Sequence, residues 1–118
     1  KNSGAESIKV WGSGKPVRDF LYVDDAARSI LFVIDKVDSE SIINVSSGKP
    51  ISIRELIECI ADTVGFVGSI EWDSSKPDGQ EIRFLSSKLI SDLGFKVEKS
   101  LSEGIKDTVR WYKESIVN

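Results

Sequence analysis

The chain has 118 residues, with 16 Lys and Arg against 19 Asp and Glu, a single Cys, and neither His nor Met. Without His there are no His-based nucleophile pairs, His general bases or His metal ligands. One Cys forms neither an internal disulfide nor a Cys-rich zinc site. The net charge of −3 argues against broad electrostatic binding to nucleic acid or to an anionic membrane.

Length and the missing Met set the expected organisation. Because translated proteins begin with Met and this sequence contains none, we expect a fragment of a longer chain. Its length is typical of one domain, so residues 1–118 are predicted to form a single domain. No apolar run approaches the roughly 20 residues that span a bilayer, and no signal peptide opens the sequence, so we expect a cytoplasmic protein.

The first part of the chain predicts short strands and one helix. Residues 8–11 alternate apolar and polar side chains, which favours a strand ended by the turn residues 12–16. Residues 20–23 are β-branched and aromatic and predict a second short strand or extended segment. Asp24 or Asp25 is predicted to cap the following helix, because acidic side chains suit a helix N-terminus. The apolar residues of this helix share one face: Ala26, Ala27, Ile30, Leu31 and Ile34.

The second part predicts further short elements. Residues 41–45 are typical of a buried strand, and Ser52 with Glu55 forms a capping box for a helix that ends at Gly65. A strand is predicted at 69–72 and a surface turn at 76–79. A short helix is predicted to begin at Ser86 or Ser87 and to end at Gly94. The capping box of Ser100 and Glu103 predicts the start of a last helix. The predicted fold class is α/β, with short strands and three or four helices.

No complete catalytic motif is present in the sequence. Gly12 and Gly14 match the first half of a dinucleotide fingerprint, but residue 17 is Val and the expected helix does not follow. A Tyr-x-x-x-Lys dyad is also missing, because the residues four positions after Tyr22 and Tyr112 are Ala26 and Ile116. We therefore expect no catalytic residue, no cofactor-binding residue and no metal ligand here, and interpret the chain as part of a larger site.

A series of blocks in a fixed order resembles a known family. The blocks are VWGSG at 10–14, VRDFLYVDDAA at 17–27, INVSSGKPISIREL at 43–56, SKL at 87–89, LGF at 93–95, LSEGI at 101–105 and WY at 111–112. The set resembles the C-terminal part of extended short-chain dehydrogenases/reductases, the NAD(P)-dependent epimerases, dehydratases and reductases of nucleoside-diphosphate sugars. Residues 11–14, 20–25 and 73–79 are similar to the GDP-L-fucose synthase branch.

The resemblance implies a small substrate-binding lobe that follows a Rossmann domain outside this chain. NAD or NADP would be held mainly by that upstream domain. The implied partner is a nucleoside-diphosphate sugar, with no nucleic acid and no membrane, and the full-length protein is expected to be a homodimer. The full-length protein would be an NAD(P)-dependent epimerase/reductase, and we expect residues 1–118 alone to be inactive.

Four residues are candidates for contact with the nucleotide-sugar. Trp11 and Arg18 match positions that contact it in this family, and Arg83 matches a basic position that faces the diphosphate. Lys76 lies in the matched Lys-Pro-Asp-Gly loop and is a further candidate contact. An Arg at position 18 suits a phosphate because its guanidinium donates two parallel hydrogen bonds, and Arg83 stands where the branch carries Lys. Each residue also has an ordinary structural interpretation, such as packing for Trp11 or an ion pair with Asp19 for Arg18.

Three alternatives to this function stay open. Gln80, Glu81 and Ser86 depart from the pattern of the branch, so the chain could belong to a UDP- or dTDP-sugar 4-epimerase or dehydratase. It could instead be a non-catalytic binding module derived from the family. A third interpretation is a folded remnant that self-associates through an apolar face.

Overall fold

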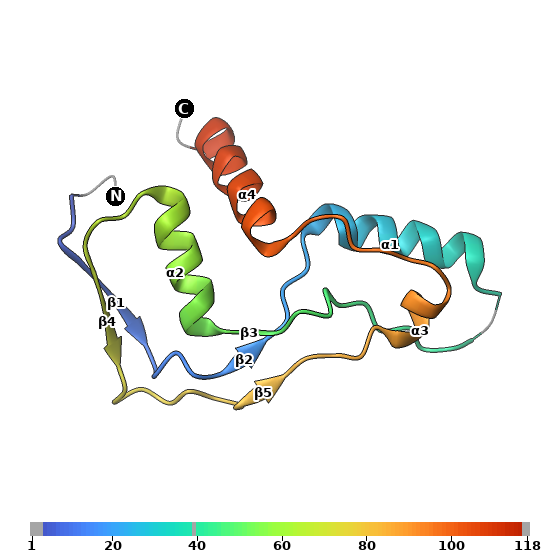
Figure 1. The fold of residues 1–118 in the computed structure, drawn as a ribbon, viewed down its shortest axis with the longest axis horizontal. Helices are drawn as coiled ribbons and strands as arrows, with labels where there is room; N and C mark the ends of the chain where they lie inside the picture. Colours follow the sequence, from blue (N-terminus) through green and yellow to red (C-terminus); the bar gives the residue numbers. More distant parts are fainter. Residues whose placement is uncertain (1–3, 39, 117–118) are drawn as a thin grey trace.

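The computed structural model describes residues 4–38 and 40–116. The elements are β1 (Ser7–Trp11), β2 (Val17–Arg18), α1 (Val23–Lys36), β3 (Ile51–Ser52), α2 (Ile53–Val64), β4 (Ser69–Asp73), β5 (Ile82–Arg83), α3 (Lys88–Asp92) and α4 (Leu101–Ile116), as Figure 1 shows. The predicted α/β class, with short strands and four helices, is confirmed.

Two small sheets organise the strands. β1 and β4 run parallel, with Ser7 opposite Ser69 and Trp11 opposite Asp73. The second sheet has the order β3-β2-β5, in which β2 is antiparallel to β3 and parallel to β5. The chain therefore passes from the first sheet to the second twice, once from β1 to β2 and once from β4 to β5 (Figure 1).

Both predicted capping boxes are confirmed. The Ser52 hydroxyl accepts a hydrogen bond from Glu55 N at 3.2 Å, and the Glu55 carboxylate accepts one from Ser52 N at 2.7 Å. At the start of α4, Ser100 N donates to Glu103 at 2.9 Å and Glu103 N donates to the Ser100 hydroxyl at 3.3 Å. α2 ends at Gly65, whose φ of 63° is the left-handed conformation that glycine adopts readily.

The predicted strand at 41–45 is wrong. Residues 20–23 form no strand either, but Tyr22 has the extended backbone that the alternative prediction for this segment allowed. Val23 is already the first residue of α1, and residues 20–22 before it are irregular. Residues 41–45 have no strand assigned, and Ile42 is 88% exposed. A strand needs a neighbour that accepts its backbone hydrogen bonds, and among the residues that the structure describes none pairs with either segment.

The predicted aspartate cap of α1 is also wrong, because Tyr22 occupies the N-cap position and makes no side-chain capping bond. Asp24 and Asp25 lie in the first turn, where their charge still suits the helix N-terminus. The buried side of α1 carries Asp25 and Ser29. Its apolar face is exposed instead, with Ile30 at 61%, Leu31 at 68% and Ile34 at 74%.

The described chain is open rather than compact. Its radius of gyration is 17.1 Å, whereas a compact chain of this length has about 13.5 Å. Among the described residues, the buried hydrophobic residues are Ala61, Ile90 and Phe95. Whether residues 1–118 form one domain stays a prediction.

Candidate functional site

Two connections between the sheets lie together and carry the four predicted site residues. We call residues 11–18 and 73–83 the loop pair. Its central contact is Asp78, whose carboxylate accepts hydrogen bonds from the Ser13 hydroxyl at 2.6 Å and from Ser13 N at 2.5 Å. These hydrogen bonds hold the pKa of Asp78 below its usual range, and the bond from the Ser13 hydroxyl has the largest effect. Asp78 is therefore an ionised clamp between the two connections.

Trp11 and Lys76 meet at one end of the loop pair. Trp11 is the last residue of β1, and its side chain is 73% exposed. The Lys76 ammonium lies 5.6 Å from the centroid of the Trp11 ring, within range of a cation–π interaction. An exposed indole with a cation beside it is a surface on which a flat or anionic ligand can bind.

Arg18 and Arg83 meet at the other end. They are direct partners in the β2–β5 pair, so their side chains leave the same face of the sheet. The Arg18 guanidinium donates to two backbone carbonyls, Val17 O and Gln80 O, each at 2.7 Å. Neither arginine has an ion pair with any residue that the structure describes. Two uncompensated guanidinium groups on one face favour an anionic ligand.

Asp19 does not pair with Arg18, so the ion pair considered as an ordinary structural role for Arg18 does not form. Its carboxylate accepts hydrogen bonds from Ser47 N at 2.7 Å and from the Ser47 hydroxyl at 3.0 Å. Asp19 thus fixes the turn before β3, and Arg18 keeps its charge for other partners.

The sequence did not point to Arg54 and Trp72, which support the loop pair. The Arg54 guanidinium lies 4.4 Å from the Trp72 ring centroid and donates to Ser13 O at 2.9 Å. Gly14 has a φ of +77°, and a Cβ there would come within 2.7 Å of the Trp72 ring. The sequence feature that could have indicated this packing is the pair Gly12 and Gly14, because glycine lets another group lie close against the backbone.

The same contacts decide whether this glycine pair suits a dinucleotide. A Cβ on Gly12 would meet the Asp78 carboxylate at 2.5 Å, and the space beside Gly14 is filled by Trp72. Because protein side chains occupy the space that a pyrophosphate would need, these residues do not fit the cofactor. Within residues 4–38 and 40–116 there is also no group of three or more metal-ligating side chains.

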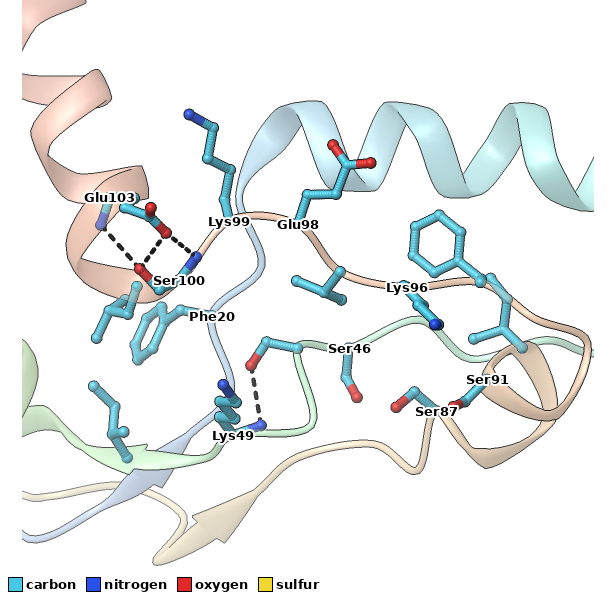
Figure 2. A pocket seen from close by; sticks show the side chains of 16 residues that line it. Phe20, Ser46, Lys49, Ser87, Ser91, Lys96, Glu98, Lys99, Ser100 and Glu103 are labelled. Atoms are coloured by element: carbon cyan, nitrogen blue, oxygen red, sulfur yellow. Dashed lines mark hydrogen bonds between the residues drawn. The ribbon is translucent and has the colours of Figure 1, made fainter.

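A pocket of the described chain lies apart from these residues. Its volume is about 580 Å³, and it is formed mainly by the turn before β3, by α3 and by the segment that leads into α4 (Figure 2). None of Trp11, Arg18, Lys76 and Arg83 lines it. The structure therefore brings the four predicted residues together as two pairs on a surface, not inside a cavity.

Comparison with known proteins shows what the chain is similar to. Residues 1–46 match the model of the NAD dependent epimerase/dehydratase family. The predicted resemblance to the NAD(P)-dependent epimerase family is confirmed by this match. Over the part of the chain that the structure describes, no helix is long and apolar enough to cross a membrane.

Several of the most similar relatives are GDP-L-fucose synthases. The chain is 41% identical to the probable GDP-L-fucose synthase 1 of Oryza sativa subsp. japonica, over 100% of this chain and 36% of the relative. A GDP-L-fucose synthetase of Naegleria fowleri with NADP bound superposes with a TM-score of 0.88 at 33% identity, covering 95% of this chain and 36% of that one.

A UDP-glucose 4-epimerase of Thermotoga maritima, solved with UDP-glucose, gives a TM-score of 0.82 at 25% identity, covering 93% of this chain and 36% of that one. The chain spans about a third of the length of these relatives.

Proposed function

We propose that this chain is the C-terminal, nucleotide-sugar-binding part of an NAD(P)-dependent epimerase/reductase of the GDP-L-fucose synthase type. The observation that carries the proposal is the Arg18–Arg83 pair on one face of a sheet. Neither guanidinium has an acidic partner among the described residues, and the chain is similar to GDP-L-fucose synthases throughout its length. Each charge-assisted hydrogen bond to a phosphate contributes roughly 1.5–3 kcal/mol, so two arginines suffice to hold a diphosphate.

In this proposal the loop pair grips the ligand at two points. Arg18 and Arg83 bind the diphosphate, and Trp11 with Lys76 contacts the nucleotide. The Asp78–Ser13 clamp keeps the two connections together, so both ends of the site are fixed before the ligand arrives. The chain contributes no catalytic residue, and NAD or NADP binds mainly to an upstream domain.

A UDP-sugar enzyme is the second candidate. It is favoured by the likeness to the Thermotoga maritima epimerase that holds UDP-glucose. The two candidates share the diphosphate and differ in the base, so they differ at the Trp11–Lys76 end of the loop pair and not at the arginines.

Calorimetric titration of the protein with GDP-mannose, UDP-glucose and dTDP-glucose tests the proposal. We expect the GDP-sugar to bind most tightly, and Arg18→Ala or Arg83→Ala to weaken it about 10- to 100-fold. Arg110→Ala is the matched control, because Arg110 is on α4 and pairs with Asp107. If neither loop-pair variant weakens any nucleotide-sugar, the site assignment is wrong; if UDP-glucose binds most tightly, the second candidate is preferred.

Turnover is the other prediction of this assignment. Residues 1–118 alone should not consume NADPH in the presence of a GDP-4-keto-6-deoxy sugar, because the groups that transfer hydride and protons are assigned outside the chain. The measurement is the decrease of NADPH absorbance, with an intact GDP-L-fucose synthase as the positive control. Reproducible consumption by the purified chain would contradict the assignment.

A further inference from the structure

The pocket of about 580 Å³ has a chemical character of its own (Figure 2). Its size is that of a pocket for a small organic molecule. Four stretches of chain contribute to it: Phe20, residues 46–51, residues 87–91 of α3 and its N-cap, and residues 95–103. These stretches do not include the loop-pair residues assigned to the nucleotide-sugar.

The lining of this pocket carries positive charge that no acidic side chain of the described residues neutralises. Its acidic residues are occupied, because Glu98 pairs with Arg28 at 2.7 Å and Glu103 accepts the hydrogen bonds of the α4 capping box. Lys99 is also occupied, since it pairs with Asp107 at 2.7 Å. Two lining cations remain, Lys49 and Lys96, and neither has an ion pair within residues 4–38 and 40–116.

Two hydroxyl groups lie beside one of these lysines. Ser87 is the N-cap residue of α3 but its side chain makes no capping bond, and Ser91 follows one helical turn later. In Figure 2 the Lys96 side chain extends toward the side of the pocket that carries Ser87 and Ser91. An ammonium group and hydroxyls together suit a phosphate, because all of them donate hydrogen bonds to its oxygens.

The rest of the lining is apolar. Phe20, Ile51, Ile90, Phe95, Val97 and Leu101 contribute to it, and Ile90 and Phe95 are among the few buried hydrophobic residues of the described chain. This wall is therefore anchored in the packed part of the molecule. A ligand that matches the whole pocket has an anionic group at one side and an apolar body at the other.

We propose that this pocket binds a small phosphate monoester with an apolar or aromatic body. Its phosphate binds beside Lys96 and the hydroxyls of α3. Its body packs against Phe20, Val97 and Leu101, and Lys49 contributes a second positive charge from the side of the pocket that carries Phe20 (Figure 2). The site is additional to the nucleotide-sugar site on the loop pair and shares no residue with it.

Amide NMR titration of the ¹⁵N-labelled chain tests this site, with phenyl phosphate as the probe. We expect saturable shifts at residues 46–51, 87–91 and 95–101, weaker shifts with inorganic phosphate, and weaker shifts with phenol, which lacks the charge. Lys49→Gln with Lys96→Gln should weaken phenyl phosphate by about tenfold or more. Lys36→Gln with Lys113→Gln changes the net charge equally outside the pocket and should leave the affinity unchanged.

Several results would overturn the proposal. The first is no saturable shift at millimolar phenyl phosphate, and the second is shifts centred on the loop pair. The third is that Lys36→Gln with Lys113→Gln weakens phenyl phosphate as much as the pocket pair does. The last is that inorganic phosphate or phenol binds as tightly as phenyl phosphate. If the Gln pair loses its dispersed spectrum, Lys96→Glu alone replaces it, because this exposed position tolerates the change. That variant should abolish the saturable shifts, and undiminished binding would equally overturn the site.

Discussion

At the scale of single residues, Asp25 holds two distant stretches of chain together. Its side chain is 1% exposed, and its carboxylate accepts hydrogen bonds from Lys99 N at 2.9 Å and Glu98 N at 3.1 Å and pairs with Arg28 at 2.5 Å. Burial acts to raise the pKa of Asp25, but the Lys99 and Glu98 backbone groups and Arg28 together hold it below the ordinary value. The interpretation of Asp25 as a helix cap missed Glu98 and Lys99, because these two partners lie more than seventy positions along the chain.

Asp25→Asn is expected to lower the free energy of unfolding by about 2–4 kcal/mol. The amide loses the charge, and its NH₂ group cannot accept the backbone hydrogen bonds that one carboxylate oxygen accepts. Urea unfolding followed by far-UV circular dichroism measures the effect. Asp35→Asn is the control on the same helix, since Asp35 is exposed and pairs only with its neighbour Lys36, and should change stability by at most about 0.5 kcal/mol. Equal effects of the two substitutions would contradict the role of Asp25.

The same carboxylate predicts the pH dependence. Because the folded-state pKa of Asp25 lies below its ordinary value of 3.8, the unfolded chain binds a proton more readily. The stabilisation is therefore present above about pH 4 and is lost as the pH falls through the folded-state pKa. The hydrogen-bonded carboxylates of Asp73 and Asp78 have lowered pKa values and act in the same direction. Urea midpoints at pH 7 and pH 3.5 should differ less for Asp25→Asn than for the parent chain.

At the scale of elements, the loop pair depends on a glycine that the fold encloses. At Gly14 a side chain would meet both an unfavourable φ of +77° and the Trp72 ring, whereas Gly79 has a φ of +73° with nothing within 4 Å. The two positions therefore separate backbone strain from steric overlap.

Gly14→Ala should destabilise the chain by about 2–4 kcal/mol, and Gly79→Ala by about 1–2 kcal/mol, because only the former adds a clash to the strain. Thermal unfolding gives the stabilities. Tryptophan fluorescence gives a second readout, since displacement of Trp72 by a new methyl group should change its emission in Gly14→Ala only. Similar results for both variants would mean that Trp72 moves aside without cost.

Elements coded by nearby residues could be predicted from the sequence. The capping boxes at Ser52 and Ser100 and the glycine that ends α2 are local signals, and the structure matches them. The two-residue strands β2, β3 and β5 could not be predicted, because each exists only through a partner far along the chain. The site residues were found by resemblance to a family, and their pairing across β2 and β5 follows from that same long-range contact. Arg54 and the large pocket had no local signal.

At the scale of the whole molecule, the exposed apolar face of α1 is the most prominent feature. Helical periodicity located Ile30, Leu31 and Ile34 on one face, but periodicity does not say what that face contacts. Within the described residues this face has no covering layer, since each of the three side chains is more than half exposed. Contiguous apolar surface of this kind drives association in water.

We expect residues 1–118 to self-associate as their concentration rises. Leu31→Glu with Ile34→Lys should shift the chain toward monomer without lowering its stability, because both positions are exposed. Val67→Ser is the matched control, as Val67 is fully exposed but lies away from α1. Multi-angle light scattering across a dilution series measures the mass. A parent chain that stays monomeric at every concentration would show that this face is tolerated in water.

The parallel pairing of β1 with β4 also imposes an order on synthesis. Ser7 of β1 pairs with Ser69 of β4, so β1 leaves the ribosome well before its partner has been synthesised. At about 5–20 residues per second, that delay is roughly 3–12 seconds, far longer than a helix such as α2 needs to form. During this interval β1 presents two unpaired edges. Lys9 lies between Ile8 and Val10 and places a charge on the nascent strand, which discourages premature pairing with another chain.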